Sequence, residues 1–210
     1  MKPVLLTETD AEFLRRCGVM ALFRVGPPPP VGRYIAVAGA RNPSKAGLSL
    51  AAELGEALAK RGAVVVTGMA RGIDFAAAVA AVRAGGRAVG VWPAVYKAPG
   101  VLEPTVESYS RIDTVLALSL YPSQNFAALL AARSRLVVCI SEALIVPEAR
   151  YRQAGWGTAV AVTHALKQGK RVVVIKPHTN QEDVVKAYRF FIERGAVSAS
   201  TPEDAVSLVF

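Results

Sequence analysis

Short apolar runs alternate along the chain with longer stretches in which apolar residues recur at helical spacing. The runs are apolar at nearly every position, which is typical of parallel strands that are covered by helices on both faces. The Ala-rich stretches between them are typical of amphipathic helices. This pattern predicts strands at 34–40, 63–68, 87–92, 114–120, 136–141 and 171–176, with a short last strand at 196–200. It predicts helices at 46–60, 73–84, 124–133, 157–168 and 181–193.

Repeated strand–helix–strand units predict an α/β fold. We expect a Rossmann-like, doubly wound, mostly parallel sheet with helices on both faces. Ligands of such sheets bind beyond the carboxyl ends of the strands, so the loops that leave those ends are the candidate sites.

The N-terminal part of the chain has a different pattern. Thr9 or Asp10 can cap a helix through AEFLRRCGVMALF, which predicts a helical appendage at residues 1–25. The segment GPPPPVG at 26–32 holds four consecutive prolines, which exclude a helix and favour an extended linker. The Rossmann-like domain is then expected to span residues 33–210.

Composition limits the class of protein. The chain has 210 residues, of which 52% are hydrophobic, and this excludes an intrinsically disordered protein. No apolar run is long enough for a membrane span, and the N-terminus lacks the apolar segment of a signal peptide. Cys17 and Cys139 are too few for a disulfide framework, and Cys139 is expected to be a small core residue. These features predict a cytoplasmic protein that has no membrane partner.

The charge is strongly basic and unevenly distributed. The formal net charge is +9, and the segment 114–181 holds eight Lys and Arg residues against the two acids Glu142 and Glu148. A basic body favours a polyanionic partner such as nucleic acid, or the phosphate groups of a small ligand. A solvated basic surface without a partner is the alternative.

The first candidate loop is GARNPS, which follows the first predicted strand of the domain. Gly39 permits a tight turn, Arg41 offers a planar fork for phosphate, and Ser44 can cap the next helix or donate to an anion there. Both the dinucleotide fingerprint G-x-G-x-x-G and the P-loop G-x-x-x-x-G-K-[ST] are absent. An ordinary capped turn is the alternative for this loop.

The second candidate loop is TGMARGID. Thr67, Gly68, Arg71 and Gly72 directly follow a buried strand, and their backbone amides could form an anion-binding nest. Asp74 stands where the next helix begins, as either a helix cap or an acceptor for a ligand hydroxyl.

The third candidate loop is GWGTA, which precedes the predicted helix at 157–168. Gly155 and Gly157 let the backbone approach a phosphate, and Thr158 can donate from the first helical turn. Trp156 can stack on a base or pack in the interior.

In order, the segments IAVAGARNPS, VVVTGMARGID, LYPSQN, VVCISEA and GWGTA resemble the DNA-processing protein A (DprA/Smf) family. This family lies in a superfamily with the LOG phosphoribohydrolases and the lysine-decarboxylase-like proteins. The resemblance covers about residues 34–177, and TGMARGID is its most specific part. It implies single-stranded DNA binding, loading of a recombinase partner and a homodimer.

The resemblance also assigns individual positions. Gly39, Arg41 and Ser44 fall on the family's G-x-R-x-x-S turn, and Asn125 falls on its R-N-R segment, whose arginines are replaced here by Gln124 and Phe126. The TGMARGID residues that fall on the family's second turn are Thr67, Gly68, Gly72 and Asp74. The glutamate that follows G-T in the LOG branch is absent from TAVAVTHAL, so no catalytic residue is assigned.

The leading hypothesis is therefore a non-enzymatic, DprA-like protein that binds single-stranded DNA, with charge from Arg41, Lys45 and Arg71. The alternative is a nucleotide-binding protein or a LOG-like phosphoribohydrolase with Trp156 against the base; a scaffold with a degenerate site is a third hypothesis. No metal or other cofactor is expected, because His164 and His178 lack partners at metal-ligand spacing. Two further bases, Arg133 and Arg135, could add to a basic rim or lie on a solvated face.

Overall fold

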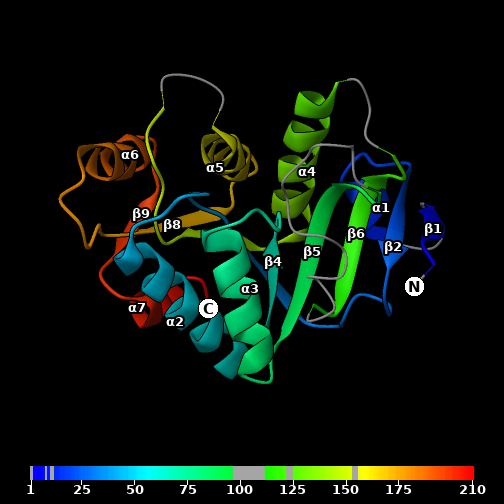
Figure 1. The fold of residues 1–210 in the computed structure, drawn as a ribbon, viewed down its shortest axis with the longest axis horizontal. Helices are drawn as coiled ribbons and strands as arrows, with labels where there is room; N and C mark the ends of the chain where they lie inside the picture. The colour runs from blue at the N-terminus through cyan, green and yellow to red at the C-terminus, as the bar shows by residue number, and fades with distance from the viewer. Residues whose placement is uncertain (1, 8, 10–11, 97–111, 122–124, 153–155) are drawn as a thin grey trace.

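One mixed sheet forms the centre of the molecule (Figure 1). The computed structural model describes residues 2–7, 9, 12–96, 112–121, 125–152 and 156–210. Within these residues the strand order is β1-β2-β6-β5-β4-β3-β7-β8-β9. The β1–β2 and β2–β6 pairs are antiparallel, and the other pairs are parallel. The strands are β1 (Val4–Thr7), β2 (Ala21–Val25), β3 (Arg33–Val37), β4 (Ala63–Thr67), β5 (Arg87–Ala94), β6 (Thr114–Ser119), β7 (Ala143–Val146), β8 (Arg171–Ile175) and β9 (Val197–Ala199).

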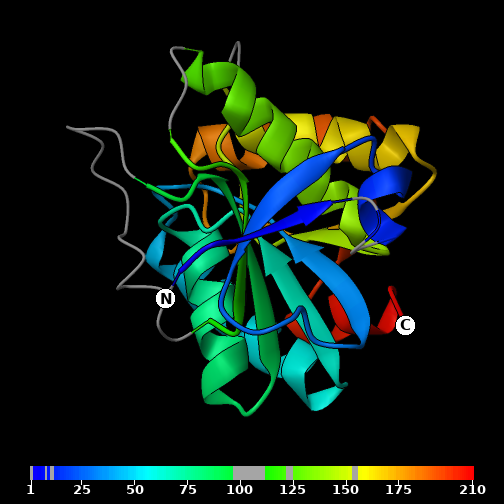
Figure 2. The ribbon, with the colours of Figure 1, turned by 90° about the vertical axis from the view of Figure 1, so that its right-hand side faces the viewer.

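Helices cover both faces of this sheet, as Figures 1 and 2 show, so the predicted fold class is confirmed. The helices are α1 (Glu12–Arg16), α2 (Lys45–Lys60), α3 (Ile73–Arg83), α4 (Phe126–Ile140), α5 (Gly157–Lys167), α6 (Glu182–Ile192) and α7 (Pro202–Ser207). Helices α2, α3 and α7 share one hydrophobic cluster, and α1, α4, α5 and α6 share the other. Strand residues alternate between the clusters: Ile35 and Val37 pack on the first face, and Ala36 packs on the second.

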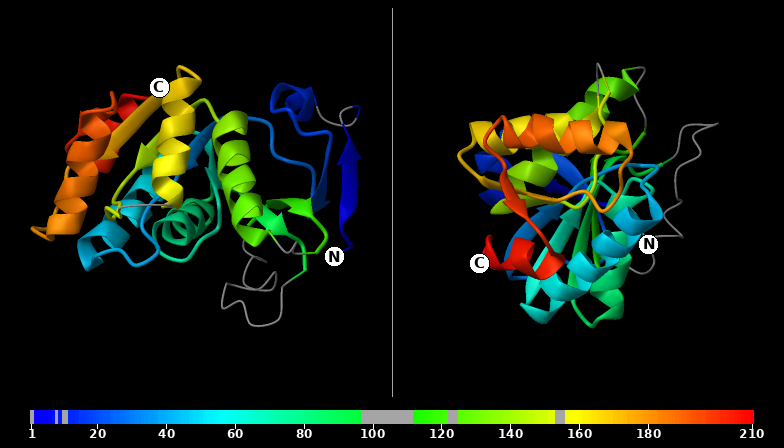
Figure 3. Two further views of the ribbon diagram at one scale, coloured as in Figure 1. Left: turned by 90° about the horizontal axis from the view of Figure 1, so that it is seen from above. Right: turned by 90° about the vertical axis from the view of Figure 1, so that its left-hand side faces the viewer.

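The chain reverses its direction of travel across the sheet beside β3. From β3 it proceeds through β4, β5 and β6 on one side, and it then returns through α4 to β7 on the other side (Figure 3). The carboxyl ends of β3 and β7 therefore diverge into helices on opposite faces. Such a switch point is where open α/β sheets bind their ligands.

The N-terminal segment differs from the predicted helix. Helix α1 ends at Arg16, Gly18 adopts a positive φ of 65°, and the following residues form β2, which pairs with β6. The predicted helix, which ran to Phe23, is wrong over its last residues, which lie in β2 (Ala21–Val25), because a short run of apolar residues fits a buried strand as well as a helix. The division of the chain into appendage, linker and domain stays a prediction.

A second correction concerns residues 136–141, which were expected to form a strand. Residues 136–140 belong to α4, Ser141 is its C-cap, and the strand is β7, which begins at Ala143. Leu136, Val137 and Val138 are all buried, so this helix is apolar around much of its circumference and resembles a buried strand in sequence. Cys139, which was expected to be a small core residue, is half-buried in α4 and forms a disulfide with Cys17.

Candidate functional site

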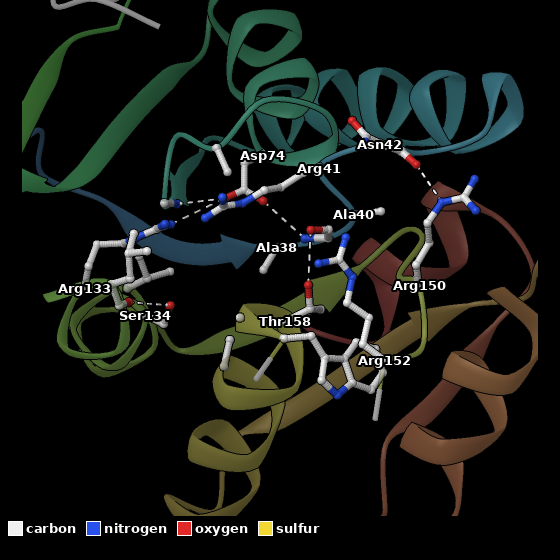
Figure 4. Close-up of a pocket in the computed structure, with 18 residues that line it drawn as sticks. Ala38, Ala40, Arg41, Asn42, Asp74, Arg133, Ser134, Arg150, Arg152 and Thr158 are labelled. Atoms are coloured by element: carbon white, nitrogen blue, oxygen red, sulfur yellow. Dashed lines mark hydrogen bonds and ion pairs between the residues drawn. The ribbon is translucent and has the colours of Figure 1, made fainter. Parts of the chain in front are cut away.

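A cleft of about 310 Å³ opens at the carboxyl ends of β3, β4 and β7, between the strand-end turns and helices α4 and α5 (Figure 4). It lies at the switch point of the sheet. Its arginines come from the turn after β3, from α4 and from the segment after β7, against one acid, Asp74. The lining residues are Ala38, Gly39, Ala40, Arg41, Asn42, Gly68, Ala70, Asp74, Leu130, Arg133, Ser134, Val137, Arg150, Arg152, Trp156, Gly157, Thr158 and Ala161.

Asp74 joins the first two predicted loops. Its carboxylate accepts the backbone N–H groups of Gly39 and Gly68, each at 3.1 Å, and lies 3.9 Å from the guanidinium of Arg133. Only 5% of Asp74 is exposed, and this burial raises its pKa to about 6, against the lowering effects of Arg133 and of the backbone N–H groups. Asp74 therefore fastens the turns after β3 and β4 to each other.

Gly68 makes room for Arg133 at the floor of the cleft. A Cβ atom at Gly68 would lie 1.4 Å from the Arg133 guanidinium, and the Arg133 side chain is only 8% exposed. Of the two alternatives for Arg133, the solvated face is therefore wrong, because α4 directs this side chain toward Asp74 (Figure 4).

Gly72 allows the second turn to pack on the first. Its φ is 87°, and a Cβ atom there would come within 2.3 Å of the Ala40 carbonyl oxygen and 2.7 Å of that of Arg41. The neighbouring N–H of Ile73 donates to the Ala40 carbonyl at 3.1 Å. The backbone that carries Arg41 therefore rests directly on TGMARGID.

Ser44 caps α2, as predicted, by accepting the Gly47 N–H at 2.9 Å. The Ser44 hydroxyl and N–H both donate to the carboxylate of Glu148, which is only 5% exposed. The anion at the N-terminus of α2 is therefore a side chain of this chain. No local signal in the sequence predicts this contact, because Glu148 lies 104 residues after Ser44.

The segment after β7 also holds the turn of Arg41 through Arg150. The Arg150 Nε donates to the Asn42 carbonyl at 2.6 Å, and its two terminal nitrogens donate to Asp183 and Gln181. These three acceptors hold the guanidinium between the turn and α6, so Arg150 links the two.

The third loop begins α5 on the far side of the cleft. Thr158 donates its hydroxyl to the Gly39 carbonyl at 3.1 Å, whereas Gly157 is exposed and has open space around its Cβ position. Arg152 is exposed and extends toward the turn after β3 (Figure 4). The α5 side of the cleft is thus more open than the side of the two turns.

Trp156 packs in an aromatic cluster. Its ring stacks on Phe191 with centroids 5.1 Å apart, and Tyr151 and Phe190 lie edge-on or tilted at 5.5 and 5.6 Å. It still lines the cleft, so its contact with a base stays a prediction.

The structure gathers half of the predicted site residues around one cleft. Gly39, Arg41, Gly68, Asp74, Trp156, Gly157 and Thr158 line it. Thr67 is buried, and its hydroxyl accepts the Met69 N–H at 3.1 Å; Asn125 caps α4 by accepting the Ala128 N–H at 3.1 Å. Lys45 and Arg71 are exposed outside the lining, and Gly155 lies outside the described residues. The lining residues that sequence analysis did not assign include Asn42, Arg150 and Arg152.

Among the described residues, no three His, Cys, Asp or Glu side chains come together as metal ligands would. No described helix is both long enough and apolar enough to cross a membrane.

The chain is thus an α/β protein with a Rossmann-like sheet and a basic cleft at the switch point, where proteins of this class bind their ligands. The chain belongs to the DNA recombination-mediator protein A family, whose model matches residues 13–210. The chain is 27% identical over 146 residues to DNA processing protein DprA of Bacillus subtilis. The matched residues make up 69% of this chain and 48% of that protein.

Solved structures share the fold. DprA from Streptococcus pneumoniae superimposes with a TM-score of 0.82 at 23% identity, over 100% of this chain and 75% of that one. DprA from Helicobacter pylori, described in a single-stranded DNA binding mode, gives a TM-score of 0.74 at 21% identity, over 90% and 86% of the two chains. The molybdenum cofactor binding protein of Rippkaea orientalis gives a TM-score of 0.61 at 22% identity, over 85% and 96%.

Proposed function

We propose that the chain binds single-stranded DNA and acts as a recombination mediator, as its family membership suggests. The observation that carries the proposal is the placement of two exposed arginines, Arg41 and Arg152, on opposite sides of a cleft whose floor holds Arg133. Guanidinium groups bind phosphate oxygens through paired donors, and they would hold the backbone of a strand without reading its sequence.

The fixed parts of the site support this role. The turn of Arg41 is held by three contacts, with Asp74, Glu148 and Gly72. The backbone that carries the Arg41 guanidinium is therefore rigid. Preorganised donors lose less conformational entropy when a ligand binds. Lys45 and Arg71, exposed beside the cleft, would extend the contact along the strand.

The test is fluorescence anisotropy of a labelled oligothymidylate, titrated at several salt concentrations with wild-type protein and with Arg41→Ala. Each phosphate contact on a single strand contributes about 0.7 to the slope of log K against log salt. We expect Arg41→Ala to weaken binding about tenfold and to lower the slope by about 0.7. Arg83→Ala is the matched control, because Arg83 ends α3 at the opposite edge of the sheet. Wild-type affinity and slope in Arg41→Ala would contradict the proposal.

A second candidate function is the binding of a free nucleotide. The cleft volume of about 310 Å³ suits a small ligand, and the similar fold of a molybdenum cofactor binding protein supports this class. An excess of mononucleotide that fully displaces the oligonucleotide would favour this candidate over the DNA strand.

We also propose a homodimer, a recombinase partner and a cytoplasmic location, all on the basis of family membership. Light scattering on the purified chain tests the dimer. Co-sedimentation of a bacterial recombinase with DNA, in the presence and absence of this chain, tests the partner.

A further inference from the structure

Positive charge also gathers away from the cleft, on the outer surface of α1, α4 and α5. Arg16, Arg135 and Lys167 are exposed there, and His164 is half-buried beside them. We call these four residues the α4/α5 patch. Helices α4 and α5 pack against each other along this side of the sheet (Figures 1 and 3).

The pairing of Arg135 is unusual for a surface arginine. Its Nε donates to Nε2 of His164 at 3.0 Å, so a neutral imidazole takes the place that a carboxylate commonly occupies. The sequences FAALLAARSRLVVCI of α4 and GTAVAVTHALK of α5 contain no acid that could replace it. Burial lowers the pKa of His164, and Arg135 and Lys167 lower it further, as expected of cations within electrostatic reach of the ring.

The side of the patch near α1 includes two acids: Glu12, one helical turn before Arg16, and Glu142. Lys170 lies there and donates its ammonium to the carbonyls of Val138, Cys139 and Ser141 at the end of α4. Burial lowers the pKa of Lys170, and Arg16 lowers it further. Glu142 acts in the opposite direction, but its carboxylate binds Arg33 at 2.6 Å. Like charges on one surface repel one another, and an anion bound between them would relieve this repulsion.

We propose that the α4/α5 patch binds phosphate groups of a DNA strand that leaves the cleft. This inference rests on the proposed function, because the cleft must hold the strand first. Helix α5 connects the two places: Gly157 and Thr158 line the cleft, and the axis rises about 9 Å from Thr158 to His164 and about 14 Å from Thr158 to Lys167. Helix α4 connects them as well, through Arg133 in the cleft and Arg135 in the patch.

The patch is a surface of charges, and the cleft is a cavity. No described residue of the patch lines the cleft, so the patch would contact the backbone of the strand and not its bases. Phosphate contacts of this kind add affinity and salt dependence but no sequence preference.

The experiment compares two oligothymidylates, a trinucleotide that can occupy only the cleft and a 20-mer that can reach the patch. Wild-type protein is compared with the double variant Arg135→Ala/Lys167→Ala and with the matched control Lys60→Ala/Arg83→Ala on the opposite face. For the 20-mer, removing two phosphate contacts should lower the salt slope by about 1.4 and weaken binding at least tenfold at low salt. Trinucleotide binding should stay at the wild-type value in both variants.

The outcomes separate this inference from the proposed function. A 20-mer that binds the double variant with wild-type affinity and slope, while Arg41→Ala weakens both oligonucleotides, overturns the patch alone. It would leave an acidic protein surface as the occupant of the patch. If neither oligonucleotide binds wild-type protein, both proposals fail. The charge reversal Lys167→Glu, checked by thermal melting to be folded, should weaken the 20-mer further than an alanine does.

Discussion

The two sides of the cleft are built differently. The turns after β3 and β4 are fixed by buried carboxylates, Asp74 and Glu148, and by close backbone contact at Gly72. On the side of α5, Arg152 and Gly157 are exposed, and Thr158 makes one hydrogen bond across to Gly39. We call these the fixed side and the open side.

The two sides also differ at the N-terminus of the helix that each contains. The N-terminus of α2 carries a capping serine that would suit a phosphate, yet Glu148 of the same chain occupies it. The N-terminus of α5 has no side-chain cap, and its first residue is an exposed glycine. Changes to the buried groups that hold the fixed side together should therefore affect folding, whereas changes to exposed groups on the open side should affect binding alone.

The largest expected effect is that of Gly72→Ala on the fixed side. The new Cβ would meet two backbone carbonyl oxygens in a left-handed conformation, and we expect a loss of about 4 kcal/mol in the free energy of unfolding. Gly62→Ala is the control: its φ is 71° but nothing lies within 4 Å, so about 1 kcal/mol is expected. Urea denaturation measures both, and equal losses would show that the contact between the turns contributes nothing.

Asp74→Asn should remove a pH dependence of stability. The folded pKa of about 6 exceeds the ordinary value near 4, so the folded state binds the proton first as the pH falls. The contribution of this carboxyl is therefore fully present below pH 4 and is lost as the pH rises through 6, a difference of about 3 kcal/mol. Urea midpoints of both proteins from pH 4 to 8 test this, and parallel curves would contradict it.

Glu148→Ala should destabilise the fixed side by about 2 kcal/mol. The half-buried Ser44 hydroxyl and N–H would lose their acceptor, whereas Glu148→Gln keeps an acceptor oxygen and should cost about half as much. Thermal melting of the two variants measures the difference. If Glu148→Ala melts at the wild-type temperature, Glu148 does not stabilise the fixed side.

The smallest effect on stability is expected from Arg152→Ala on the open side. We expect a change within 0.5 kcal/mol in the free energy of unfolding, because Arg152 is exposed. Binding of oligothymidylate should fall several-fold, by about 1 kcal/mol. Anisotropy and urea denaturation on the same preparation test both parts, and a large loss of stability would abolish the distinction between the sides.

Much of the fold could be predicted because its strands are local apolar runs. The strands and helices between residues 33 and 94 are confirmed to within a few residues, since each is bounded by a glycine or a cap such as Ser44. Helix α4 was partly predicted as a strand because Leu136, Val137 and Val138 carry no periodicity. Strands β1 and β2 were missed, since β2 depends on pairing with distant β6 and β1 depends on pairing with β2.

The candidate site was predictable at its loops but not at its long-range partners. Arg41, Gly68 and Asp74 follow strands directly, and the structure brings them to one cleft. The partner of Ser44 is 104 residues away, and the guanidinium that fills the space at Gly68 comes from a helix on the opposite face of the sheet. Local spacing therefore identifies donors to a ligand, whereas tertiary packing decides which of them the protein uses internally.

The close fit between the turns has a consequence for exchanging parts between relatives. Gly72 touches the backbone of Ala40 and Arg41, and Glu148 holds both Ala40 and Ser44. In a chimaera that receives only the GARNPS loop of another family member, the foreign loop would face Gly72 and Glu148 of this chain, which are not matched to it. The transferable unit consists of three separate segments, 38–48, 67–74 and 147–152, which must be moved together for the graft to keep its shape.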